Sequence, residues 1–68
     1  MPRYFFHVYI GEKVGRDMMG LELPTLDDAI ADAERARVEI MLEDALDGLW
    51  LEILDQSGKV VALVPAAA

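Results

Sequence analysis

Apolar residues gather in three short runs of this chain that have the composition of β-strands. Residues 3–10 (RYFFHVYI) are rich in aromatic and β-branched side chains and too short for a typical helix, so they predict a strand. Residues 49–54 (LWLEIL) and 59–64 (KVVALV) have the same character. The DQSG between them, residues 55–58, has Asp and Gly where a tight turn favours them. The last two runs therefore predict a hairpin, which Pro65 ends.

From residue 26 onward the apolar positions recur instead with the 3.6-residue period of an amphipathic helix. Thr25 is a favourable N-cap residue, and the carboxylate of Asp28 can complete a capping box. Gly48 is the residue type that commonly follows a helix, so we predict a helix of about 21 residues, roughly 32 Å long. Many of its apolar residues are alanines, which let a helix lie close against a sheet.

The stretch between the first strand and the helix is rich in turn-forming residues. Residues 11–20 (GEKVGRDMMG) contain three glycines and four charged residues and predict a connection. Residues 21–23 (LEL) alternate and predict a short returning strand, closed by Pro24. If the helix crosses over between the second and third strands, the first strand fits between them and is antiparallel to both. We therefore expect one α+β domain over residues 1–65.

Its predicted sheet has four antiparallel strands in the order 2-1-3-4, with one long helix packed on one face. We expect the tail, residues 66–68, to fray.

The alternation of side chains along the strands divides this sheet into two faces. The face that we expect the helix to cover holds Tyr4, Phe6, Val8, Ile10, Leu49, Leu51 and Ile53. The opposite face holds a second, largely apolar set: Phe5, His7, Tyr9, Trp50, Leu54, Val61 and Leu63. This division assumes that the DQSG turn pairs Leu54 with Lys59, which places Val60, Ala62 and Val64 inside.

A single helix covers only one face, and a second face with this many rings exceeds what monomers usually expose. We therefore expect a homo-oligomer, most simply a dimer, that packs through the second face. A different protein or a flat ligand on this face is one alternative, and a small sheet that tolerates a few surface aromatics is another.

Composition excludes several other classes of function. The chain has 68 residues, no cysteine and one histidine, so we expect no disulfide, no metal site and no cofactor. Its net charge of −7 argues against binding nucleic acid or an anionic membrane through phosphate contacts. The sequence has neither an apolar run of about 20 residues nor the pattern of a signal peptide, so we expect a cytoplasmic protein.

Two groups of residues could carry chemistry of their own. His7 is the one side chain that ordinarily titrates near neutral pH, and a hydrogen bond to Asp17 would orient its ring. With no cysteine and no serine linked to it, structural pairing of His7 is expected, and a minor enzyme with His7 as its acid–base group is the least favoured hypothesis. Acidic residues also lie along the helix at Asp28, Asp32, Glu39 and Glu43. This run predicts a solvated face, with an acidic decoy for a basic protein surface as the alternative.

Several motifs resemble a known family. They are the opening MPRYFFHV, the pattern Asp17-x-x-Gly20-x-Glu22-Leu23, the alanine-rich helix and the late Asp55-x-x-Gly58-x-Val60. Together they resemble short bacterial proteins, mainly alphaproteobacterial, that are catalogued as a domain of unknown function, and the resemblance spans residues 1–65. This chain ends in VPAAA where many members have an aromatic residue after the proline. The resemblance implies one small α+β domain and brings no activity, so we expect a non-enzymatic module.

Overall fold

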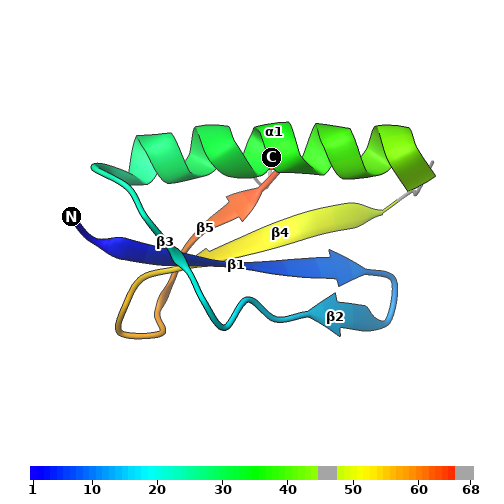
Figure 1. Ribbon diagram of the computed structural model, residues 1–68. Helices are drawn as coiled ribbons and strands as arrows, with labels where there is room; N and C mark the ends of the chain where they lie inside the picture. The colour runs from blue at the N-terminus through cyan, green and yellow to red at the C-terminus, as the bar shows by residue number, and fades with distance from the viewer. Residues whose placement is uncertain (45–47, 66–68) are drawn as a thin grey trace.

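The computed structural model describes residues 1–44 and 48–65, and over these residues one helix lies across one face of an antiparallel sheet (Figure 1). The elements are β1 (Arg3–Ile10), β2 (Lys13–Gly15), β3 (Leu21–Glu22), α1 (Leu26–Asp44), β4 (Leu49–Leu54) and β5 (Val60–Val64). The predicted α+β class is confirmed. Residues 66–68, for which we predicted fraying, lie outside the described residues.

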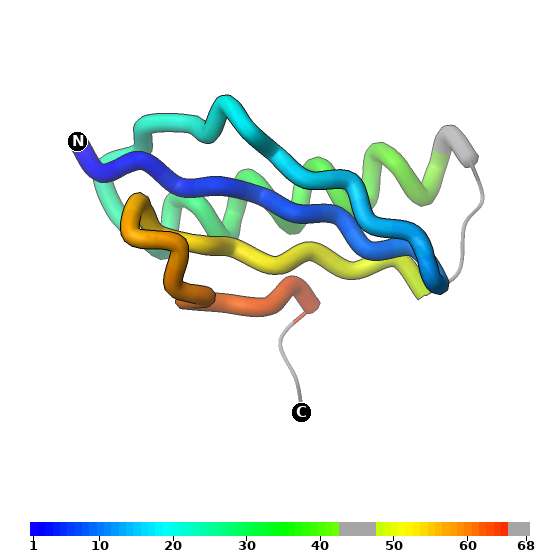
Figure 2. The backbone as a smooth tube through the Cα atoms, turned by 90° about the horizontal axis from the view of Figure 1, so that it is seen from below, coloured from blue at the N-terminus to red at the C-terminus, as the bar shows by residue number. Residues whose placement is uncertain are grey.

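The sheet has five strands over the described residues, whereas the sequence predicted four. The strand order is β2-β1-β4-β5, and β3 also pairs with β1, further along the same side of β1 as β2 (Figure 2). Val8 pairs with Gly15 in β2, and Tyr4 pairs with Leu21 in β3. The predicted returning strand is therefore made in two pieces. β1 lies between these two segments and β4, and β5 pairs with the other side of β4.

The helix begins where the sequence predicted it. The hydroxyl oxygen of Thr25 accepts the backbone N–H of Asp28 at 3.2 Å, and the hydroxyl donates to the Asp28 carboxylate at 3.0 Å. This pair of contacts satisfies one of the free N–H groups in the first turn and fixes the direction in which the chain enters α1.

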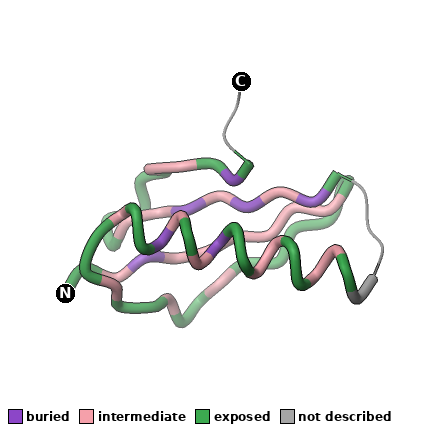
Figure 3. The backbone as a smooth tube through the Cα atoms, turned by 90° about the horizontal axis from the view of Figure 1, so that it is seen from above, coloured by how far each residue is buried: buried purple, intermediate pink, exposed green. Residues whose placement is uncertain are grey.

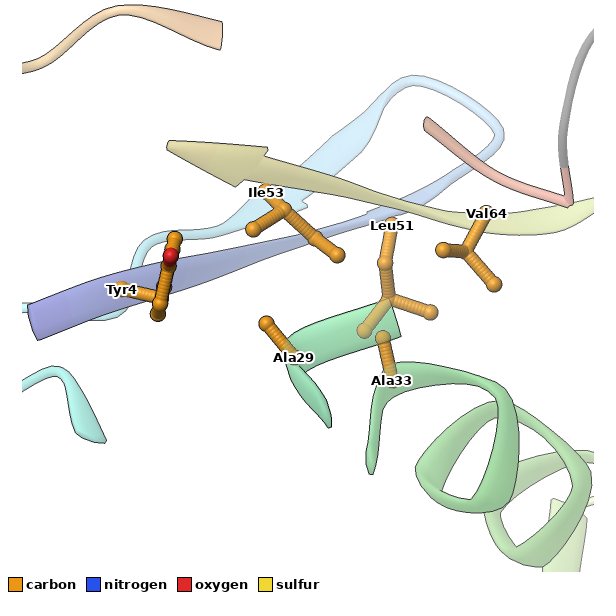
Figure 4. Packing of buried hydrophobic residues seen from close by; sticks show 6 residues of the cluster. All are labelled: Tyr4, Ala29, Ala33, Leu51, Ile53 and Val64. Atoms are coloured by element: carbon orange, nitrogen blue, oxygen red, sulfur yellow. The ribbon is translucent and has the colours of Figure 1, made fainter. Parts of the chain in front are cut away.

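The core lies between α1 and the sheet. Buried positions alternate along β4, as Figure 3 shows, because every second side chain points toward the helix. Ala29 and Ala33 are fully buried on α1, where their methyl groups face Leu51, Ile53 and Val64 (Figure 4). The small alanines bring the helix backbone close to the sheet, so the larger strand residues fill the space between the two layers.

The predicted register of β5 was wrong by one residue at Leu54 and by two residues at the pairs beyond it. Leu54 pairs with Val60 and not with Lys59, while Ile53 pairs with Ala62. Val61 is therefore the extra residue of a β-bulge. Its side chain packs against the core, and Val60 is left 45% exposed. Val61 consequently does not belong to the face opposite the helix, and Val60 does.

Candidate functional site

The face of the sheet opposite α1 is bare over the described residues, and Figure 2 views the molecule from this side. We call it the open face. The register aligns its residues in cross-strand pairs, Phe5 with Leu54, His7 with Glu52 and Tyr9 with Trp50. Its outer positions are Val14, Val60 and Leu63.

Two stacked rings lie near one end of the open face. The Tyr9 and Trp50 ring centroids are 4.2 Å apart and the ring planes differ by 8°. The Tyr9 hydroxyl donates to the Glu52 carboxylate at 3.0 Å. This hydrogen bond, together with desolvation and the charge of Glu52, raises the pKa of Tyr9. The tyrosine is therefore a neutral donor at physiological pH, and the stack is a preformed, half-buried apolar surface.

The remaining apolar side chains make the open face wider than this stack. Val14 is 43% exposed and Leu63 is 40% exposed, on opposite sides of β1 and β4. Five of the seven predicted interface residues are half-buried on this face, and Leu63 is exposed there: Phe5, His7, Tyr9, Trp50, Leu54 and Leu63. The structure therefore brings together six of the seven, whereas Val61 is partly buried and packs against the core on the helix side.

Asp17 holds together the edge at which the returning strand is interrupted. Its Oδ2 accepts the backbone N–H of Phe6 in β1 at 3.2 Å, and its Oδ1 accepts the N–H groups of Met19 and Gly20 at 3.0 Å each. Burial raises the pKa of the Asp17 carboxyl, but the hydrogen bonds from Gly20, Phe6 and Met19 outweigh it, with a smaller attraction to His7, and the pKa lies below its ordinary value. In the gap between β2 and β3, the carboxylate accepts a backbone N–H of β1, as a backbone carbonyl of a continuous edge strand would.

His7 and Asp17 are in contact, but through different atoms from those that the sequence suggested. Nδ1 of His7 accepts the backbone N–H of Asp17 at 3.2 Å, while the Asp17 carboxylate is engaged by backbone donors. An accepting Nδ1 leaves the proton of the neutral ring on Nε2. The carboxylate therefore does not orient the imidazole as the acid partner of a catalytic histidine does.

A hollow of about 330 Å³ lies on the open face beside His7. Phe5, His7 and Leu54 contribute to it from the strands, Asp17 and Met18 from the β2–β3 loop, and residues 55–58 from the β4–β5 turn. That turn is held by Asp55, whose Oδ1 accepts from the Ser57 hydroxyl and from the N–H groups of Ser57 and Lys59. The same contacts, the Ser57 hydroxyl foremost, hold the pKa of Asp55 below its ordinary value.

Arg3 and Gly20 also shape this end of the face, and the sequence did not single them out as a pair. Arg3 donates to the Met19 carbonyl at 2.7 Å and to the Glu22 carboxylate at 3.1 Å. Gly20 has a φ of 72°, and a β-carbon there would lie 2.8 Å from Cγ of Arg3 and 2.9 Å from Cε1 of Phe5. The glycine lets the loop backbone pass directly against β1. The one signal of this close approach in the sequence was a glycine, Gly20, directly before the short predicted strand at residues 21–23.

The acidic residues of α1 lie in the helix layer, on the other side of the sheet from the open face. Asp28 and Glu39 are exposed and Asp32 is half-buried, whereas the side chain of Glu43 lies outside the described residues. Asp28 is engaged with the Thr25 hydroxyl, and Asp32 lies 3.4 Å from Arg35. Within residues 1–44 and 48–65, no three His, Asp or Glu side chains gather as a metal site would need, and no helix is long and apolar enough to span a membrane.

Comparison with known proteins identifies a family and no activity. The family model described as "Domain of unknown function (DUF6894)" matches residues 3–67, nearly the whole chain. No curated protein and no solved structure matches the sequence significantly.

Proposed function

The chain belongs to the DUF6894 family, and we propose that it is a non-enzymatic module that associates with a second copy of itself through the open face. The observation that carries the proposal is the Tyr9–Trp50 stack on a face that α1 does not cover. Rings that are only half-buried in one chain gain further burial when two sheets pack face to face, as in β-sandwiches.

The distribution of charge supports a second copy as the occupant. Residues 25–47, which include α1, contain eight of the thirteen acidic residues and two of the six basic residues. The rest of the chain, which contains all the strands, has five acidic and four basic residues. The sheet part is therefore almost neutral at −1 and the helix part carries −6. Two copies that meet through their sheets keep the repelling helices on the outside.

The size of the open face sets the expected strength of this association. The 24 strand residues, at about 3.3 Å each in strands about 4.8 Å apart, give a face of roughly 400 Å². Face-to-face pairing would then bury on the order of 800 Å² in total, in the range of weak, transient interfaces. We therefore expect a reversible dimer with a dissociation constant in roughly the micromolar range.

The test is the mass in solution of the intact chain by sedimentation or light scattering, from about 1 μM to about 1 mM. We expect the mass to rise from 7.5 kDa to at least twice that value. Trp50→Ala removes half of the stack, and Tyr9→Lys charges the face while keeping a donor for Glu52. Both variants should shift the transition to higher concentration.

Leu42→Lys is the matched control, because Leu42 is 80% exposed on α1, on the other layer. A wild-type mass that stays at 7.5 kDa overturns the proposal, and so does an equal shift in all three variants. A different protein, a flat ligand or a sheet that tolerates a few surface aromatics would then be the remaining alternatives for this face.

The acidic decoy stays a prediction, and no described contact favours it, since Asp28 and Asp32 already have partners within the helix. Binding of a basic protein that weakens steeply with salt and is lost when Glu39 is neutralised would support it. The cytoplasmic location likewise stays a prediction.

A further inference from the structure

We propose that β5 is a second self-association site, at which β5 of another copy adds in antiparallel fashion and continues the sheet from one molecule into the next. This proposal does not depend on the open face, because it concerns the backbone edge of the sheet and the helix side beside it.

The two edges of the sheet differ in how far they are protected. One edge is split into β2 and β3, and the Asp17 carboxylate occupies the interruption. The other edge is β5, which pairs only with β4 among the described strands. Val60–Val64 contains no charged residue and no proline, and the bulge at Val61 and the following Pro65 leave residues 62–64 as the regular part of this edge. Its outward N–H and C=O groups form a template for one more strand.

A groove beside β5 marks where side chains of an added strand would lie. The helix runs to one side of β5 in both Figure 2 and Figure 3. Between them is a groove of about 230 Å³, lined by Val64 and Pro65 from the strand side and by Glu34, Arg37 and Val38 from α1. Val38 is 52% exposed there. A sheet extended past β5 would cover this apolar wall.

The chemistry of the groove fits a second copy of the same chain. A two-fold axis perpendicular to the sheet, through residues 62–64, keeps inward side chains on the inward face and puts both helices on the same side. The two grooves then merge into one. Each groove is lined by one carboxylate, Glu34, and one guanidinium, Arg37, so Glu34 of one copy can pair with Arg37 of the other. Arg37 is held in position by its Nε, which donates to the Leu49 carbonyl at 2.9 Å.

Amide hydrogen exchange of the intact chain, resolved by residue, tests this directly. The N–H groups of β5 that face away from β4 exchange rapidly in a monomer and are protected by an added strand. We expect their protection to rise at least tenfold between dilute and concentrated protein. The N–H groups that face β4 supply the internal reference. Protection should persist in Tyr9→Lys, in which the face-to-face contact is weakened, so failure of one proposal is distinguishable from failure of the other.

Glu34→Lys tests the merged groove, and Glu39→Lys is its control, with the same change of charge at an exposed helix position outside the groove. We expect concentration-dependent protection to be lost in the first variant and kept in the second. Outward β5 amides that exchange equally fast at both concentrations overturn the second copy as the occupant. If protection of the outward β5 amides rises with concentration equally in Glu34→Lys and Glu39→Lys, the two grooves do not lie side by side in the dimer.

Discussion

Replacing Asp17 by asparagine tests how the split edge of the sheet is held. The substitution keeps the shape of the side chain but leaves one acceptor oxygen where there were two. That oxygen can serve Phe6 or the pair Met19 and Gly20, not both sites. The other site would face an NH₂ group, which is itself a donor.

The magnitude follows from the number and kind of hydrogen bonds. A hydrogen bond to a charged group contributes about 1.5–3 kcal/mol, and one between neutral groups about 0.5–1.5 kcal/mol. Asp17 is half-buried and solvent replaces part of the loss, so we expect unfolding free energy to fall by about 2 kcal/mol. For a domain of this size, that is a decrease in Tm of roughly 8–16 °C. It is a substantial share of a total of about 3–10 kcal/mol.

The assay is urea unfolding at one fixed protein concentration, followed by the fluorescence of Trp50, the sole tryptophan. Glu12→Gln, which neutralises an exposed carboxylate in the β1–β2 turn, is the control. Because the folded-state pKa of Asp17 lies below its ordinary value, its contribution is present at neutral pH. It is lost as the pH falls from about 4 through the folded-state pKa. The gap between wild type and Asp17→Asn should therefore narrow below about pH 4.

Two results would refute this reasoning. One is an Asp17→Asn variant within about 0.5 kcal/mol of the Glu12→Gln control, the range of ordinary surface substitutions. The other is a gap between wild type and Asp17→Asn that stays constant down to about pH 2, well below the ordinary pKa of an aspartate.

Three further predictions use the same preparations. Ile53→Ala removes a fully buried side chain and should lower the unfolding free energy by about 2–4 kcal/mol in urea; a loss near zero would show that β4 does not carry the core. Gly20→Ala and Gly58→Ala both place a β-carbon at positive φ, at a cost of roughly 1 kcal/mol. Only Gly20 is also crowded by neighbouring atoms, so its variant should be clearly the less stable, and equal Tm values would contradict the close approach. Glu52→Leu removes the acceptor and should lower the pKa of Tyr9 toward its ordinary value in an ultraviolet titration, and an unchanged titration curve would exclude the hydrogen bond between them.

Local signals predicted more of this fold than long-range ones. Thr25 and Asp28 determine the helix start by contacts three residues apart, and alternation along β4 is a property of the strand itself. The bulge at Val61 and the split between β2 and β3 depend instead on pairing with distant strands. No pattern of apolar residues indicated that the carboxylate of Asp17 would serve as an edge acceptor for β1.

On the open face, too, local patterns predicted positions better than they predicted contacts between distant residues. Tyr9 and Trp50 were placed on the correct face because side-chain alternation follows from the strand assignment alone. Leu63 lies on the predicted face because the pairs beyond the bulge are shifted by two residues, which restores the original alternation. The approach of His7 to Asp17 was predicted from the turn between them, but the choice of backbone N–H over carboxylate was not. That choice is made by Phe6 and the loop donors, which compete for the same carboxylate oxygens.

The loop closed by Asp17 has a fixed length. Its Oδ1 reaches the N–H groups two and three residues further along the chain, and Gly20 then passes beneath Arg3 and Phe5. One inserted residue between Asp17 and Gly20 would carry both donors out of reach. The turn at Gly11, where a side chain would meet nothing within 4 Å, has room for extra residues. Peptide tags and spectroscopic labels therefore belong in the β1–β2 turn, and the neighbouring loop should be left intact in any engineered version of this domain.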